Sequence, residues 1–260
     1  MSDIVTLHFS EVGQGMPVVL LHGFPLCSAI WREQQARLSD HYRVISPDLR
    51  GHGESSAPAG IYEMEAMARD VLALLDSFDI EKAVILGHSM GGYVALAAWK
   101  LAPERFLALG LIDSQAAEDS EEARKGRLRM AEKVIAEGNQ ALATVMLSKL
   151  FSPALDADAP IIEQVRQMIL KTHRTAIIGS LNGMAVRHDA TGTLATINIP
   201  MLILTGDKDQ IISTSTAKAM TFLVSNATLA IIENAGHMPM LERPEATTAA
   251  IRKFLSTVGE

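Results

Sequence analysis

The stretch Ala83-Val84-Ile85-Leu86-Gly87-His88-Ser89-Met90-Gly91-Gly92 decides the fold. An apolar run rich in β-branched residues ends at Gly87, and helix-forming residues follow from 93 to 101. This order predicts a strand, a sharp turn and a helix, with Ser89 at the apex of a G-x-S-x-G frame. Such a turn strains the serine backbone, and side chains at positions 87 and 91 would collide. The alternative is a glycine-rich turn that only packs tightly, so the rest of the chain must supply a base and an acid.

The composition limits the class of protein. The chain has 260 residues, of which 48% are hydrophobic and 20% charged, which is enough for one large α/β domain with an insertion. A net charge of -7 argues against nucleic acid or an anionic membrane as a partner. Cys27 is the one cysteine, so an internal disulfide is excluded and a reducing compartment fits best. Because residues 1–4 resemble no signal peptide and no apolar run is long enough to span a membrane, we expect a cytoplasmic protein.

Outside one segment, short apolar runs alternate with amphipathic runs, as in a parallel sheet covered by helices. A glycine-rich stretch at 11–15 reads as a hairpin turn between the first two strands. The expected strands are 4–9, 17–21, 42–46, 83–87, 106–112, 200–204 and 228–232. The expected helices are 30–38, 64–78, 93–101, 216–223 and 244–257.

The exception is the segment 115–187, which reads as helix after helix. The expected helices are 124–137, 141–151, 161–171 and 175–186, broken by Gly138, residues 152–153, residues 159–160 and Gly179. We therefore predict an α/β fold in which residues 1–114 and 188–260 form a core domain with a mostly parallel sheet. Residues 115–187 would form a helical insertion between two of its strands.

A serine hydroxyl needs a general base, and the base needs a carboxylate. In open parallel sheets such groups gather at the carboxyl ends of the strands. Of the eight histidines, His237 fits best, because it follows the final strand in the loop 234–239. His22 and His52 lie beside glycines, where bracing a loop is the expected role, and the side chain of His88 should point away from that of Ser89. The remaining histidines, His8, His41, His173 and His188, are expected to be structural or exposed.

The acid should lie between Ser89 and His237 in the sequence. Asp207 and Asp209 follow the strand at 200–204, and Asp113 follows an earlier strand. Asp207 falls in the turn itself, where it would cap a backbone N–H, so Asp209 is better able to reach a histidine.

An oxyanion hole requires two backbone donors. One would be the N–H of Met90, at the start of the helix after Ser89, where the helix dipole also favours negative charge. The other would be the N–H of Phe24, in the loop after the strand at 17–21. The side chains of Phe24 and Met90 would then border an acyl pocket; simple apolar packing is the alternative.

Together these motifs resemble the α/β-hydrolase fold family over essentially the whole chain. The matching residues are His22-Gly23-Phe24-Pro25, Asp48-Leu49-Arg50-Gly51-His52-Gly53, Gly87-His88-Ser89-Met90-Gly91-Gly92, Gly206-Asp207-Lys208-Asp209 and Gly236-His237. The resemblance implies that Ser89 lies in a nucleophile elbow and forms a catalytic triad with Asp209 and His237. It also implies that residues 115–187 form a cap over the pocket. One departure is that many relatives carry a proline a few residues after the acid, where this chain has Ile211-Ile212-Ser213.

Among subgroups, the chain resembles small esterases, 3-oxoadipate enol-lactonase-like hydrolases and cofactor-free haloperoxidases. A serine at position 89 argues against epoxide hydrolases and haloalkane dehalogenases, which use an aspartate there. The leading expectation is a serine hydrolase that cleaves small carboxylic esters or lactones through an acyl-enzyme on Ser89. The alternatives are C–C bond hydrolysis, elimination or perhydrolysis with the same triad, or a receptor-like ligand-binding protein on this fold.

The expected partner is a small-molecule ester or lactone. No cofactor or metal is expected, because the histidines and carboxylates lack ligand spacing in the sequence. Arginines of the insertion could include an anchor for a substrate carboxylate, although an arginine on an amphipathic helix is usually solvated. These are Arg124, Arg127, Arg129, Arg166, Arg174 and Arg187.

Overall fold

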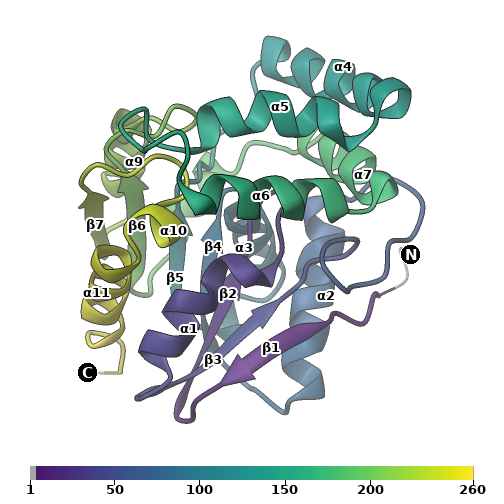
Figure 1. Ribbon diagram of the computed structural model, residues 1–260. Coiled ribbons are helices and arrows are strands. Elements are labelled where there is room, and N and C mark those ends of the chain that lie inside the picture. Colours follow the sequence, from purple (N-terminus) through teal and green to yellow (C-terminus); the bar gives the residue numbers. More distant parts are fainter. Residues whose placement is uncertain (1–3, 260) are drawn as a thin grey trace.

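The computed structural model describes residues 4–259 and confirms the predicted fold class. Seven strands form one sheet in the order β1-β3-β2-β4-β5-β6-β7 (Figure 1). Every pairing is parallel except that of β1 with β3. The strands are β1 Phe9–Val12, β2 Met16–Leu21, β3 Tyr42–Pro47, β4 Ala83–His88, β5 Phe106–Ile112, β6 Met201–Gly206 and β7 Ala227–Ile232.

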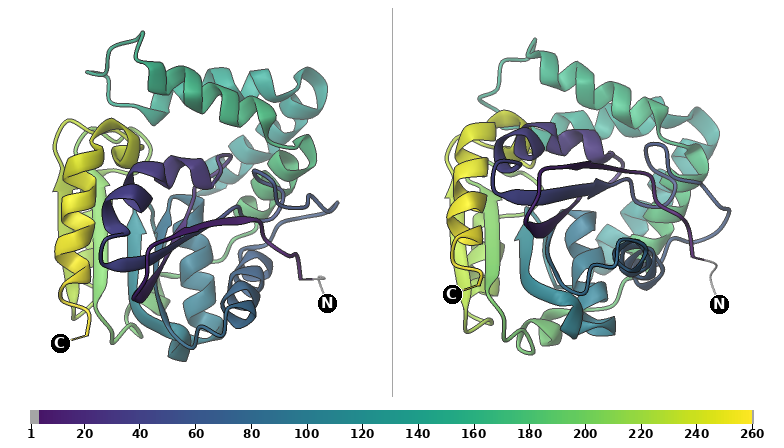
Figure 2. Two further views of the ribbon diagram at one scale, coloured as in Figure 1. Left: turned by 60° about the horizontal axis from the view of Figure 1, so that its bottom comes forward. Right: turned by 90° about the horizontal axis from the view of Figure 1, so that it is seen from below.

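Helices cover both faces of the sheet. Helices α1 and α11 pack together on one face, and α2 and α3 pack together on the other (Figure 2). The core helices are α1 Arg32–Leu38, α2 Met64–Ser77, α3 Met90–Leu101, α9 Thr214–Thr221 and α11 Pro244–Leu255. Short helices not foreseen from the sequence are α8 Thr191–Leu194, α10 Pro239–Glu242 and the 3₁₀ turns Ser28–Trp31 and Pro103–Arg105.

The central strands are continuous apolar runs because helices shield both of their faces. All six residues of β4 are buried, whereas in the edge strand β7 only Ile232 is buried and the other residues are partly or fully exposed. Leu21 of β2 pairs with Gly87 of β4, and His88 pairs with Ile112 of β5. These registers bring the loops after β2, β4 and β5 to one edge of the sheet.

The predicted strand at residues 4–9 and the predicted hairpin turn at 11–15 are wrong, because β1 spans Phe9–Val12 and does not pair with β2. Strand β1 pairs with β3, and β2 lies on the other side of β3. Gly13 passes close to the start of β3: a Cβ added to it would lie 2.2 Å from the carbonyl oxygen of Tyr42, the first residue of that strand. The glycine-rich turn therefore carries the chain past β3, which takes the position between the two strands.

Between β5 and β6, ahead of the short helix α8, four longer helices lie over the edge at which the parallel strands end (Figure 1). They are α4 Glu121–Glu137, α5 Asn139–Leu150, α6 Pro160–Lys171 and α7 Arg174–Ala185. All four predicted helices are present, but the break expected at Gly179 is wrong, because Gly179 lies inside α7. An added Cβ there would lie 2.9 Å from the ring of Tyr62, so close packing explains this glycine. Within residues 4–259, none of the helices has the length and apolar character that a membrane crossing requires.

Candidate active site

Ser89 stands in a strained turn between β4 and α3. Its backbone has φ 50° and ψ −115°, a conformation that residues other than glycine rarely adopt. A Cβ on Gly87 would lie 2.2 Å from the carbonyl oxygen of Gly91, and one on Gly91 would lie 2.6 Å from that of Leu21. The steric reason given above for the two glycines is thereby confirmed.

The end of β5 and the loop after β2 lie on either side of Ser89. Its N–H donates to the carbonyl oxygen of Ile112 over 2.9 Å, and its own carbonyl accepts from the hydroxyl of Ser114 over 2.8 Å. The loop after β2 lies directly against it, since a Cβ on Gly23 would be 3.1 Å from Cβ of Ser89. The next residue in that loop is Phe24, so the loop with the expected oxyanion donor reaches the serine. Met90 begins α3, where an N–H has no acceptor within the helix.

The structure brings Asp209 and His237 together. Nδ1 of His237 lies 2.8 Å from Oδ2 of Asp209, and both side chains are buried. Oδ1 of Asp209 accepts from the N–H groups of Ile211 and Ile212 over 2.7 and 3.1 Å. Burial acts to raise the pKa of Asp209, but His237 and these N–H groups outweigh it, so the pKa lies below its ordinary value. Ile211 and Ile212 thus each supply a backbone donor that a proline at the same position would lack.

Of the other two candidate acids, only Asp113 reaches this cluster. A carboxylate oxygen of Asp113, a carboxylate oxygen of Asp209 and a ring nitrogen of His237 all lie within 4.8 Å of one another. Oδ1 of Asp113 accepts from the N–H of Gly206 over 2.9 Å and from the hydroxyl of Thr205 over 3.1 Å. Burial and the neighbouring Asp209 hold the pKa of Asp113 well above its ordinary value. Asp207, in contrast, is partly exposed and pairs with Lys208 over 2.8 Å.

Three buried histidines support the loops around Ser89. Nε2 of His22 accepts from the N–H of Leu49 over 2.9 Å, and Nδ1 of His52 lies 3.0 Å from the carbonyl oxygen of Arg50. These contacts confirm the predicted bracing role. Sequence reasoning missed that Nε2 of His88 donates to the carbonyl oxygen of His237 over 2.8 Å. Burial, as the main cause, lowers the pKa of His52 and His88 to about 3, so both rings stay neutral.

Glu242 is a second residue that sequence reasoning missed. This buried carboxylate accepts from the N–H groups of Gly236 and Ser152 over 2.8 Å each, and from that of Met238 over 3.3 Å. Burial raises its pKa, against the effect of the three N–H donors. Glu242 thereby joins the loop of His237 to the segment between α5 and α6.

Four of the six candidate anchor arginines pair with carboxylates of the chain itself. Arg127 and Arg187 both pair with Asp119, and Arg187 also lies 4.0 Å from the ring centre of Tyr93. Arg124 pairs with Glu118, and Arg166 pairs with Glu163. These internal contacts already engage the four guanidinium groups.

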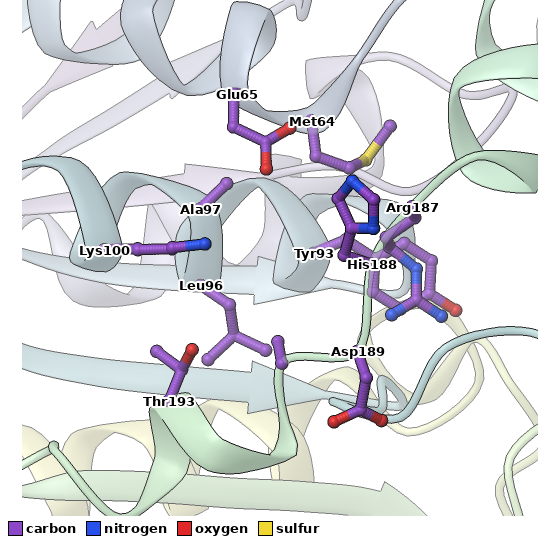
Figure 3. Close-up of a pocket in the computed structure, with 11 residues that line it drawn as sticks. Met64, Glu65, Tyr93, Leu96, Ala97, Lys100, Arg187, His188, Asp189 and Thr193 are labelled. Carbon is purple, nitrogen blue, oxygen red and sulfur yellow. The ribbon is translucent and has the colours of Figure 1, made fainter.

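Two hollows of the described structure involve residues of α3 and of α6. One, of about 30 Å³, lies beside α3 and includes Tyr93 and Arg187, with the carboxylates of Glu65 and Asp189 on opposite sides (Figure 3). The other, of about 600 Å³, lies between α6 and the loops that carry Cys27 and Gly53. Neither is lined by Ser89, Asp209 or His237.

The comparison with known families agrees with this geometry. The sequence profile of the alpha/beta hydrolase fold matches residues 16–244, so the chain belongs to the α/β-hydrolase fold family.

Individual relatives narrow the class. The structure of a thermophilic esterase from Thermogutta terrifontis superposes with a TM-score of 0.96 at 40% identity, over 98% of this chain and 95% of that chain. The enol-lactonase from Burkholderia xenovorans LB400 superposes with a TM-score of 0.89 at 27% identity, over 97% of each chain. 3-Oxoadipate enol-lactonase 2 of Acinetobacter baylyi is 28% identical over 254 residues, 96% of this chain and 93% of that protein. The chain is thus an esterase- or lactonase-like hydrolase.

Proposed function

We propose that this protein hydrolyses small carboxylic esters or lactones through an acyl-enzyme on Ser89, with His237 as the base and Asp209 as the acid. The observation that carries the proposal is the buried hydrogen bond of 2.8 Å between His237 and Asp209. The loop of His237 is tied to His88, the residue before the strained serine. The three side chains follow β4, β6 and β7, in the chain order serine, acid, histidine that this fold uses.

The hydrogen bond to Asp209 supports a distinct role for each nitrogen of His237. Because Asp209 accepts from Nδ1, the imidazole carries its proton there and Nε2 is free to act as a base. His237 takes the proton of the Ser89 hydroxyl as the oxygen attacks the carbonyl carbon, and Asp209 stabilises the resulting imidazolium. The proton then passes to the departing alkoxide. Water, activated by the same histidine, releases the acid from Ser89.

The N–H groups of Met90 and Phe24 would stabilise the negative charge on the carbonyl oxygen. Two such donors, fixed before the reaction, are worth several kcal/mol in related chemistry, about 2.7–4 kcal/mol for one donor. The position of Gly23 against Ser89 supports the assignment of Phe24, and the position of Met90 at the start of α3 supports the second donor.

We further propose that helices α4 to α7 act as a cap that limits the substrate to small molecules. The cap is attached to the core just after α5 and just after α6. The Thr172 hydroxyl donates to the carbonyl oxygen of Pro25 over 2.8 Å, and the N–H of Ser152 donates to Glu242. Both contacts lie next to loops of the site, which favours a closed pocket over a mobile interfacial lid.

A fluorophosphonate probe and p-nitrophenyl acetate turnover test the proposal. Wild-type protein should form one adduct and turn over the ester steadily, which would also exclude a receptor-like role. Ser89→Ala should lose the adduct and about 10⁴- to 10⁶-fold of kcat, as triad removals do. Ser148→Ala, an exposed serine on α5, is the matched control and should retain both. An adduct on another serine, with Ser89 unmodified, would refute the assignment.

A further inference from the structure

Asp113 is a buried carboxyl group for which the triad has no role. It directly follows Ile112, the last residue of β5. Its backbone has a left-handed conformation, φ 44°, and none of its surface is exposed. Its N–H donates to the carbonyl oxygen of Leu204 over 2.8 Å, and its Oδ1 accepts from Gly206 and Thr205. The residue is therefore held rigidly by the end of β6, the strand that leads into the loop of Asp209.

The other oxygen of Asp113 lacks a donor. Oδ2 is buried and has no hydrogen-bond donor among the residues that the structure describes. The carboxyl group of Asp209 is its close neighbour, and the two are near enough to share a hydrogen bond when one of them holds a proton. The other titratable rings nearby are His237, which donates to Asp209, and His88, which donates to the backbone of His237.

Two carboxylates this close and this buried do not both ionise, so one holds a proton. The surroundings decide which one. Asp209 receives hydrogen bonds from His237, Ile211 and Ile212 on its two oxygens, which stabilise its charged form. Asp113 receives its two hydrogen bonds on Oδ1 alone, which leaves Oδ2 for the proton.

We propose that Asp113 is a positioning residue that stays protonated in the folded protein and donates a hydrogen bond to Asp209. The carboxylate of Asp209 is the acceptor that its position beside Asp113 offers for such a proton. The bond fixes the plane of the Asp209 carboxylate from the side of β5, while the loop N–H groups fix it from the other side. It also leaves one negative charge, not two, beside the imidazolium that forms on His237. This role rests on the proposed function, but the protonation state of Asp113 does not.

The pH dependence of unfolding tests the protonation state without any measurement of activity. In the unfolded chain an aspartate releases its proton near pH 4, whereas Asp113 keeps it in the folded chain. From pH 5 upward, for as long as the folded Asp113 keeps its proton, the unfolding equilibrium constant of the wild type, relative to that of Asp113→Asn, should therefore rise tenfold per pH unit. Asp207→Asn is the matched control. Its carboxylate is charged in both the folded and the unfolded chain, so the unfolding constant of the wild type relative to that of Asp207→Asn should not change with pH. A flat ratio for Asp113→Asn as well would overturn the proposal.

Turnover then tests the positioning role. Asp113→Asn keeps a carbonyl oxygen for Gly206 and Thr205 and an amide N–H for Asp209, so it should preserve most of kcat. Asp113→Ala removes the donor and should lower kcat by about 10²-fold, the cost of a misplaced catalytic group, with little change in KM. Equal losses in the two variants would overturn the proposal, since they would indicate a charged Asp113. Wild-type turnover by folded Asp113→Ala would also overturn it. If the wild type had no esterase activity, the proposed function would fail while the unfolding result still stood.

Discussion

The N–H of His237 donates a hydrogen bond of 2.9 Å to the carbonyl oxygen of Leu150, the last residue of α5. The expected general base is therefore tied directly to the helical segment above it. Glu242 strengthens this connection, because it accepts from both sides of the junction, Gly236 and Ser152. A displacement of the end of α5 should therefore also displace the backbone of His237, to which it is hydrogen-bonded.

We expect Glu242→Gln to weaken this junction. The glutamine amide presents an N–H group where a carboxylate oxygen accepted, so at least one buried donor loses its partner, at a cost of about 1–3 kcal/mol. Displacement of His237 should lower kcat more than it raises KM. Urea unfolding and p-nitrophenyl acetate kinetics measure the two effects. Glu245→Gln, an exposed glutamate on α11, is the control, and an equal response of the two variants would contradict the role of Glu242.

The assignment of the acid gives a second prediction. In Asp209→Asn the amide favours the wrong histidine tautomer, so kcat should fall by about 10⁴-fold. Asp207→Asn, two residues away and paired with Lys208 at the surface, should retain most of its activity. Both variants need a folding check by circular dichroism. Greater loss in Asp207→Asn than in Asp209→Asn would show that the acid had been assigned to the wrong residue.

The sequence predicted six of the seven strands and the candidate triad for the same physical reason. A parallel sheet covered on both faces leaves apolar runs, and each of Ser89, Asp209 and His237 follows such a run. The pairing of β1 with β3 was not predicted, because strand order depends on contacts between distant segments, whereas a glycine-rich turn suggests only a local hairpin.

The supporting residues were missed for a related reason. Glu242 meets Ser152 across 90 positions in the sequence, and His88 meets His237 across 149. No local spacing marks such contacts. Asp113 was considered as a candidate acid because it follows a strand, but its position beside Asp209 depends on β5 and β6 being neighbours.

The buried histidines predict how stability depends on pH. His22, His52 and His88 have lowered pKa values and stay neutral when folded, but each binds a proton in the unfolded chain below about pH 6.5. The unfolded state therefore binds more protons, and the free energy of unfolding should fall as the pH drops from 6.5 toward 3. His52 and His88, whose pKa values are lowered to about 3, each contribute about 1.4 kcal/mol per pH unit over this range, and His22 contributes in the same direction. Urea unfolding at several pH values should show a slope smaller by one proton in His52→Gln; an unchanged slope would refute a neutral His52.

The ion pair between Arg50 and Asp70 makes a prediction about stability alone. Two hydrogen bonds of 2.6 and 2.7 Å join the side chains, and both are almost completely buried. Asp70→Asn should cost about 3–5 kcal/mol because it removes one charge from a buried, hydrogen-bonded ion pair. Asp76→Asn breaks an exposed pair with Arg105 and should cost at most about 1 kcal/mol. If thermal unfolding showed similar losses for the two, burial would not govern the strength of these pairs.

The last prediction concerns the substrate. The cap is hydrogen-bonded to the loop of Phe24 through Thr172 and to the loop of His237 through Leu150, so it is fastened on both sides of Ser89. Phe24 itself is almost fully buried and would narrow the acyl side. The specificity constant for p-nitrophenyl esters should therefore be highest for short acyl chains and fall steeply as the chain lengthens. Thr172→Val removes one attachment at nearly constant volume and should raise the relative rate for longer chains. A maximum at long chains in the wild type, or activation at an oil–water interface, would contradict a closed pocket.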